Sequence, residues 1–214
     1  MQFPPLSRFG RIAGHLVSWL APPYKARCYL ADLNPQGYIS PNAAIHHAGL
    51  KITGNVFIGD RCVIYQSNSG SVELGERVQL YSDIIIETGY EGCVTIGAET
   101  HIQPRCQIMA YVGSLQIGCR CEIAPNCAFY PYNHDILPNK DIMSQSPYTK
   151  GGIIIGDGVW LGVGVIVLDG VRIGDGAVIG AGSVVTGDIP ENAIAVGVPA
   201  RVVKMRADNV TNHE

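Results

Sequence analysis

A strict six-residue repeat between residues 155 and 185 constrains this chain more than any other feature of its sequence. Every sixth residue there is aliphatic, namely Ile155, Leu161, Val167, Ile173, Ile179 and Val185. A helix repeats about every 3.6 residues and an ordinary strand about every 2, so neither accounts for this period. Three such hexads make one triangular turn of about 18 residues in a parallel coil. The repeat therefore predicts an all-β fold, a parallel β-helix.

The residues between the aliphatic positions fit the same coil. Glycine follows the aliphatic residue at four of the six positions, and we expect it to permit the tight corner. The fourth residue after each aliphatic position is small or β-branched. In the upstream coils this position holds four cysteines: Cys62, Cys106, Cys121 and Cys127. We expect these cysteines to be buried packing residues.

The same register continues upstream with interruptions and predicts about seven to eight triangular coils within residues 36–190. Between Ile117 and Ile155 the chain has room for one coil and an excursion of about 20 residues, which is long for a regular solenoid. We therefore expect a protruding loop at residues 135–152. A short helical segment is expected at residues 1–35, and a C-terminal tail at residues 191–214.

Composition excludes several classes of protein. The net charge is -3 and only 15% of residues are charged, so no basic field that would attract nucleic acid is expected. The seven cysteines include no C-x-x-C pair, which argues against a zinc site or a disulfide framework and fits a reducing cytoplasm. No apolar run reaches about 18 residues, so neither a membrane span nor a signal peptide is expected.

Three stretches of the C-terminal part are distinctive: Ile155-Gly156-Asp157-Gly158-Val159-Trp160-Leu161-Gly162, the repeat from Ile173 to Thr186, and Gly197-Val198-Pro199-Ala200-Arg201. They resemble galactoside and maltose O-acetyltransferases of the hexapeptide-repeat family. The resemblance runs from about residue 117 to 206. It implies left-handed coils, acetyl-CoA as co-substrate without a metal, and a homotrimer with active sites between neighbouring chains.

Acetyl transfer to a hydroxyl needs a base, and His134 is the candidate. It lies where the excursion leaves the coil that begins at Ile117, and the resemblance places the family's catalytic histidine on it. Asp135 either orients the imidazole or caps the loop. The neighbouring side chains of Tyr130, Tyr132 and Asn133 either contact the acceptor or pack.

The resemblance also maps five residues onto the cofactor-binding positions of the family: Trp160, Ala181, Thr186, Arg201 and Lys204. Trp160 follows Val159 at an outward position, so it is expected to stack on a ligand or on a neighbouring chain. Read from the sequence alone, Ala181 and Thr186 are ordinary repeat residues. Arg201 and Lys204 fit phosphate contact or a solvated basic tail.

The expected acceptor is a sugar hydroxyl, within surface polysaccharide biosynthesis. The stretch that carries an Asn and two acidic residues in the family reads Gln103-Pro104-Arg105-Cys106 and Ala110-Tyr111-Val112 here, so the acceptor's identity stays open. Alternatives are N-acetylation of a nucleotide-linked amino sugar, serine acetylation and, on the same coil, a metal-dependent carbonic anhydrase.

Residues 1–33 combine basic side chains with an apolar helical stripe. Their cations are Arg8, Arg11, Lys25 and Arg27, and no acidic residue precedes Asp32. A helix that caps the open end of the solenoid explains this pattern. Peripheral contact with an anionic membrane is the alternative.

Overall fold

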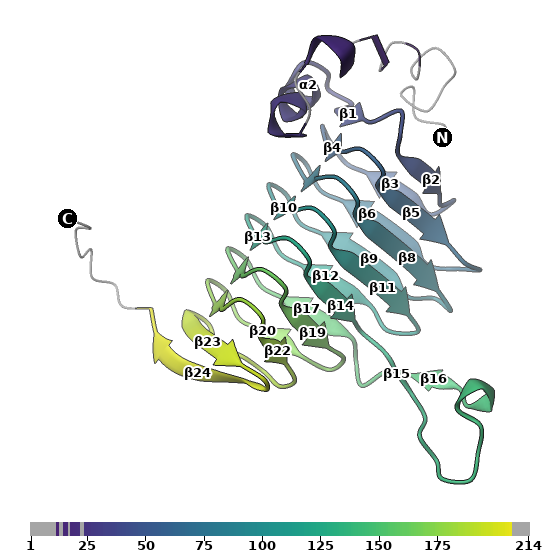
Figure 1. Ribbon diagram of the computed structural model, residues 1–214, viewed down its shortest axis with the longest axis vertical. Helices are drawn as coiled ribbons and strands as arrows, with labels where there is room; N and C mark the ends of the chain where they lie inside the picture. The colour runs from purple at the N-terminus through teal and green to yellow at the C-terminus, as the bar shows by residue number, and fades with distance from the viewer. Residues whose placement is uncertain (1–11, 13–14, 17, 22–23, 207–214) are drawn as a thin grey trace.

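The computed structural model describes residues 12, 15–16, 18–21 and 24–206 of the chain. These form a left-handed parallel β-helix of about seven coils whose three flat sides are parallel sheets (Figure 1). The predicted fold class is confirmed.

Each coil contributes one short strand to each side of the prism. Sheet A contains β1 (Tyr38–Ile39), β4 (Phe57–Ile58), β7 (Gln79–Leu80), β10 (His101–Ile102), β13 (Glu122–Ile123), β18 (Trp160–Leu161), β21 (Val178–Ile179), β23 (Ala193–Gly197) and β24 (Ala200–Met205). Sheet B contains β2 (Ala44–His46), β5 (Val63–Gln66), β8 (Ile85–Gly89), β11 (Gln107–Tyr111), β14 (Ala128–Tyr130), β19 (Ile166–Leu168) and β22 (Val184–Val185). Sheet C contains β3 (Leu50–Ile52), β6 (Ser71–Leu74), β9 (Cys93–Ile96), β12 (Leu115–Ile117), β17 (Ile153–Ile155) and β20 (Arg172–Ile173).

The register of sheet C shows how the chain accommodates the predicted excursion. Ile117 pairs with Ile96 on one side and with Ile155 on the other. All three side chains are buried in the single core that fills the prism. The residues between β14 and β17 therefore leave the coil and return to it without disturbing the stack.

The glycine after each aliphatic residue has a different role from the expected one. A Cβ added at Gly162 would lie 2.6 Å from the backbone nitrogen of Ala181 in the next coil. The corner itself is made two residues later, where Gly158 and Gly164 have φ of 62° and 71°. In the N-terminal coils the corresponding left-handed residues include arginine, for example Arg61 at φ 57°. The glycine that directly follows the aliphatic residue thus serves the close approach of successive coils rather than the corner.

The four cysteines of the repeat are buried, as predicted. Cys62 shows the environment clearly, because burial raises the pKa of its thiol to about 12. The thiol of Cys127 contacts the carbonyl oxygen of Gly162 at 3.3 Å. These residues therefore act as small packing side chains in the buried core.

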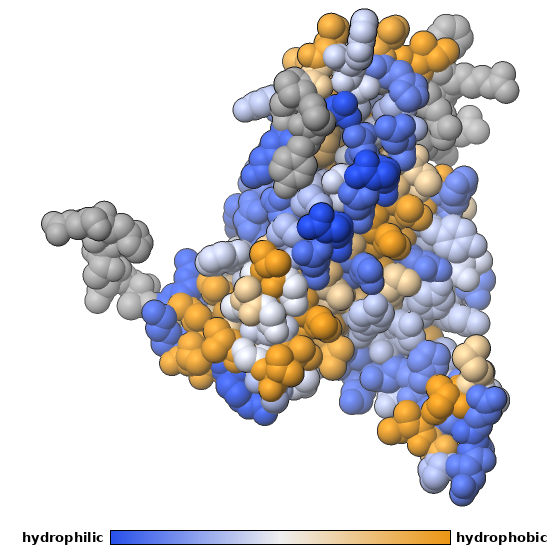
Figure 2. Space-filling view, in the orientation of Figure 1, coloured by the Kyte–Doolittle hydropathy of each residue, from blue (hydrophilic) through white to orange (hydrophobic). Residues whose placement is uncertain are grey.

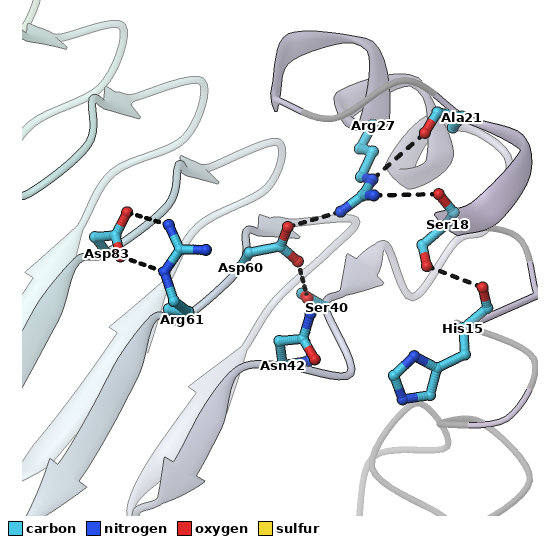
Figure 3. A network of polar contacts seen from close by, with 9 residues as sticks. All are labelled: His15, Ser18, Ala21, Arg27, Ser40, Asn42, Asp60, Arg61 and Asp83. Carbon is cyan, nitrogen blue, oxygen red and sulfur yellow. Dashed lines mark hydrogen bonds and ion pairs between the residues drawn. The ribbon is translucent and has the colours of Figure 1, made fainter.

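The N-terminal segment is docked beside the first coils. It includes η2 (Tyr24–Cys28) and α2 (Tyr29–Asp32), and Ala31 packs with Tyr38 and Phe57 of sheet A and with Tyr81, which follows β7. Figure 3 shows Arg27 joining this segment to the solenoid: its Nη1 lies 2.6 Å from Asp60 Oδ2, and Nη2 donates to the Ser18 carbonyl at 3.2 Å. Asp60 also accepts a hydrogen bond from the Ser40 hydroxyl.

Part of the basic apolar stripe expected at residues 1–33 lies outside the described residues, including Arg8 and Arg11. The described residues 12, 15–16 and 18–20 are helical. In the described part of the chain, no helix is long and apolar enough to cross a membrane.

The expected tail begins with a hairpin. β23 continues sheet A in parallel with β21, and β24 then returns antiparallel along β23. Residues 207–214 lie outside the described residues.

Candidate active site at the projecting loop

The loop leaves the corner that joins sheet B to sheet C, which we call the B–C corner. Asn133–His134 (β15) pairs antiparallel with Pro147–Tyr148 (β16), so the base of the loop is a two-stranded ribbon. A short 3-10 turn, η3 (Ile142–Ser144), precedes β16 on the returning side of the loop. The loop projects well beyond the prism at the bottom of Figure 1.

Asp169 anchors both ends of this loop. Its side chain is buried at the B–C corner of the following coil. Oδ2 accepts hydrogen bonds from Asn133 Nδ2 at 2.8 Å and from the Lys150 amide at 2.6 Å. Oδ1 accepts from Thr149 Oγ1 at 2.8 Å and from the Gly152 amide at 3.0 Å. The carboxylate therefore fixes the residue before His134 to the residues where the chain rejoins the coil.

His134 is exposed immediately beside this anchor. Its ring contacts the Tyr132 ring edge-on, with centroids 5.8 Å apart. Asp135 donates its amide to the Ser146 carbonyl at 3.4 Å. Among the described residues no hydrogen bond joins the Asp135 carboxylate to the His134 imidazole. The structure thus presents a solvent-facing imidazole on an anchored backbone, which is the arrangement that a general base needs.

Tyr90, Tyr111 and Tyr132 form a column of tyrosines along the B–C corner. The column begins beside His134 and runs towards the N-terminal coils. The Tyr90 and Tyr111 centroids are 6.2 Å apart, and those of Tyr111 and Tyr132 are 5.6 Å apart. The Tyr111 hydroxyl donates to Glu87 Oε1. Burial, followed by this contact with Glu87, raises the pKa of Tyr111 to about 12.

Sequence reasoning named Tyr132 but missed Tyr90, Tyr111, Glu87 and Asp169. A signal for the tyrosines was present, because successive members of the column are separated by the same number of residues as Ile96 and Ile117. Asp169 stands with Gly170 directly after a repeat strand, where the hexad pattern offers no reason for a carboxylate. Only its position beneath the loop explains it.

The side chains of Tyr130 and Asn133 form hydrogen bonds within the chain near His134. The Tyr130 hydroxyl contacts Gln107 Oε1 at 3.3 Å, on the outer face of sheet B. The Asn133 amide is engaged by Asp169. Of the three expected acceptor residues, only Tyr132 touches the His134 ring.

The five expected cofactor residues lie on different parts of the prism. Trp160 is 54% exposed on sheet A, which confirms its outward position. Arg201 and Lys204 are exposed on β24 of the same sheet. Ala181 is exposed at the corner between sheets A and B. Thr186 follows β22 and shares the B–C corner with His134, two coils further along.

One chain does not bring His134 and Trp160 together. The B–C corner is the edge of the triangular prism that lies opposite sheet A. A ligand lying across Trp160 on one side of the prism is therefore separated from His134 of the same chain by the filled core. Within the described residues, no three His, Cys, Asp or Glu side chains gather as a metal site would need.

Two separate exposed apolar areas lie on the projecting loop and on the C-terminal hairpin. On the loop they are Ile136, Leu137, Ile142 and Met143. On the C-terminal hairpin they are Val196, Val198, Val202, Val203 and Met205. Figure 2 shows both areas in orange, on the loop at the lower right and on the hairpin at the lower left.

Comparison with known proteins identifies related sequences. A family model described as "Bacterial transferase hexapeptide (six repeats)" matches residues 152–187. The chain is 34% identical over 148 residues to WbbJ of Escherichia coli (strain K12), a protein assigned as a lipopolysaccharide biosynthesis O-acetyl transferase. That alignment covers 65% of this chain and 74% of WbbJ.

Solved structures share the fold at lower sequence identity. AntD, an N-acyltransferase from Bacillus cereus solved with dTDP and Coenzyme A, superposes with a TM-score of 0.59 at 22% identity, covering 86% of this chain and 91% of AntD. NeuO, a polySia specific acetyltransferase, superposes with a TM-score of 0.54 at 22% identity, covering 81% of this chain and 85% of NeuO. Both likenesses support the β-helix architecture.

Proposed function

The chain belongs to the hexapeptide-repeat family of bacterial acyltransferases, and from that premise we propose that it transfers an acetyl group from acetyl-CoA to a hydroxyl of a saccharide. His134 is the general base. The observation that carries this assignment is the exposed imidazole of His134, held on a backbone that the buried Asp169 anchors from both sides. The expected setting is the biosynthesis of a surface polysaccharide.

The reaction follows from the position of the imidazole. A ring nitrogen of His134 takes the proton from the acceptor hydroxyl as its oxygen attacks the thioester carbonyl carbon. The tetrahedral intermediate collapses, the carbon–sulfur bond breaks, and the imidazolium returns the proton to the departing CoA thiolate. Asp135 positions the base in this sequence through the backbone, because its amide donates to the Ser146 carbonyl at the base of the loop. An ester and free CoA are the products.

Acetyl-CoA is proposed to lie between two chains. AntD was solved with Coenzyme A, which supports a CoA site on this fold. Trp160, Arg201 and Lys204 on sheet A of one chain would hold the CoA, with Ala181 and Thr186 at the adjoining corners. The base would come from His134 of a neighbouring chain, because sheet A lies opposite the B–C corner within each prism. A homotrimer satisfies this arrangement with three equivalent sites.

The saccharide acceptor is supported by what the relatives act on. WbbJ is assigned to lipopolysaccharide biosynthesis, and NeuO acts on polySia. AntD is an N-acyltransferase, which favours the alternative that the acceptor is the amine of a nucleotide-linked sugar. Turnover with hydroxyl-bearing glycans but not with amino sugars on nucleotide carriers would separate the two.

A His134→Ala variant tests the mechanism. Release of CoA thiol in the presence of a glycan acceptor should fall by about 10² to 10⁴, the usual loss when a general base is removed. Binding of CoA, measured by calorimetry, should be unchanged, and His46→Ala serves as a matched control on an exposed histidine of the first coil. An unchanged rate in His134→Ala would remove this residue from the mechanism.

A further inference from the structure

We propose that the tyrosine column is a binding platform for a glycan chain, and that the acceptor is an uncharged or amino-containing oligosaccharide or polysaccharide rather than a single sugar. This inference rests on the proposed function, because it places the reacting sugar at His134. The remaining sugars would lie along Tyr132, Tyr111 and Tyr90.

The column is continuous with the candidate base and longer than one sugar. Its rings come from the B–C corners of three successive coils, and the Tyr132 ring contacts the His134 ring. Successive coils of a β-helix are about 4.8 Å apart, the ordinary strand spacing. A single pyranose ring at His134 would cover one coil and leave the other tyrosines without a partner. A glycan that runs along the corner would place a sugar beside each ring.

The exposure of the column suits a ligand. Tyr90, at the end farthest from His134, is 56% exposed, while Tyr111 and Tyr132 are half-buried. Tyrosine offers a large and rigid amphipathic surface with little side-chain entropy to lose on binding. The apolar C–H faces of sugars pack on such rings, and their hydroxyls remain free for polar contacts.

Glu87 supplies a polar contact beside the middle ring. Because the pKa of Tyr111 is raised to about 12, its hydroxyl stays protonated and continues to donate to the Glu87 carboxylate. The carboxylate has further acceptor positions for sugar hydroxyls or for the ammonium group of an amino sugar. Tyr111 therefore fixes the direction in which Glu87 can accept.

The charge of the corner selects against acidic glycans. No Lys or Arg occurs in residues 87–92, 109–114 or 130–135, whereas Glu87, Glu91 and Asp135 are all in these segments. An anionic sugar chain along these three segments would meet like charges and no Lys or Arg side chain of theirs, while Lys150 lies at the same corner where the chain rejoins the coil. The surface thus differs from what a polyanionic acceptor would require.

A glycan array tests the proposal with the full-length protein. Labelled wild type should bind uncharged or amino-containing glycans of three or more sugars better than their monosaccharides. Tyr90→Ala should reduce that signal about tenfold, as expected for loss of one aromatic contact. Tyr90→Phe keeps the ring and should retain binding. Tyr29→Ala, which removes a tyrosine that is 73% exposed on α2, should bind as wild type does.

The outcomes separate this proposal from the proposed function. Absence of any bound glycan, binding confined to acidic glycans, or equal binding by Tyr90→Ala would overturn the platform. A change of oligomeric state in Tyr90→Ala, seen by light scattering, would assign the column to an interface between copies and overturn it as well. His134→Ala should keep the array signal while losing transfer. If the protein binds glycans on the array but His134→Ala transfers acetyl groups at the wild-type rate, the proposed base is wrong and the glycan platform is still supported.

Discussion

The side-chain amide of Asn133 donates a hydrogen bond to the buried carboxylate of Asp169, which is 36 residues away in the sequence but only one coil away in space. The same carboxylate binds the chain where it re-enters the solenoid at Lys150 and Gly152. The direction in which His134 faces is therefore set by a residue that has no contact with the imidazole.

Replacing Asp169 with Ala should disturb the position of His134 without unfolding the β-helix. Its four hydrogen bonds would be lost, so the loop ribbon should loosen while the core below it stays intact. We expect kcat to fall by about 10 to 10², as for a base that is displaced by about 1 Å, with an unchanged KM for acetyl-CoA. Limited proteolysis should cut residues 135–146 faster. Asp83→Ala, which removes a partly exposed carboxylate paired with Arg61 far from the loop, is the matched control and should do neither.

Mixing two inactive variants tests whether the site is shared between chains. A chain with His134→Ala and a chain with Trp160→Ala each lack one half of the site. If base and cofactor residues come from different chains, an equal mixture that is unfolded and reassembled should regain activity at about one quarter of its sites. Activity is measured before and after reassembly. No recovery at all would place both groups in the same chain's site.

The close approach of coils at Gly162 predicts a loss of stability that a glycine without such a contact should not show. Gly162→Ala would push a Cβ against the Ala181 backbone and should lower the free energy of unfolding by about 1–3 kcal/mol. Gly187→Ala meets nothing within 4 Å and has no left-handed φ, so it should be neutral or stabilise by about 0.4–1 kcal/mol. Denaturant unfolding of both variants at one protein concentration compares them. Equal effects would contradict the close-approach explanation.

His47 should make the first coils sensitive to acid. Burial lowers the pKa of its imidazole, so the folded protein binds fewer protons at this residue than the unfolded chain does. The folded state therefore accommodates the neutral imidazole better than the protonated one. Its full stability is present above the unfolded pKa of about 6.5 and decreases as pH falls below that value. The melting temperature should drop between pH 7.5 and pH 5.5, and the drop should be smaller in His47→Gln. A drop of the same size in both proteins would point to other groups.

The role of a residue could be predicted from the sequence when that residue follows the six-residue repeat. Every coil needs apolar side chains at the same positions to fill the core. The burial of the aliphatic residues from Ile155 to Val185 and of the four cysteines could therefore be inferred without a structure. The role of the hexad glycine was mistaken, because a contact between coils cannot be read from the conformation expected at one residue. Asp169 escaped notice for a similar reason, since its partners lie across a loop whose path no periodicity describes.

The candidate site was predicted in part. Context and resemblance together point to His134, but the separation of sheet A from the B–C corner becomes visible only when the three sides of the prism are assembled. Trp160 was expected to face outward and does. The tyrosine column could be recognised only from the coil register and the ring contacts together.

The reversal of β24 along β23 gives this solenoid a definite end. A stack of parallel coils offers its last strands as a template on which another coil, or another molecule, could continue to add. At sheet A that growth is stopped by a strand running the opposite way, whose exposed edge carries Arg201 and Lys204. Within the described residues, a fold built by repetition therefore ends at sheet A on a strand that breaks the repeat and carries charge on its exposed surface.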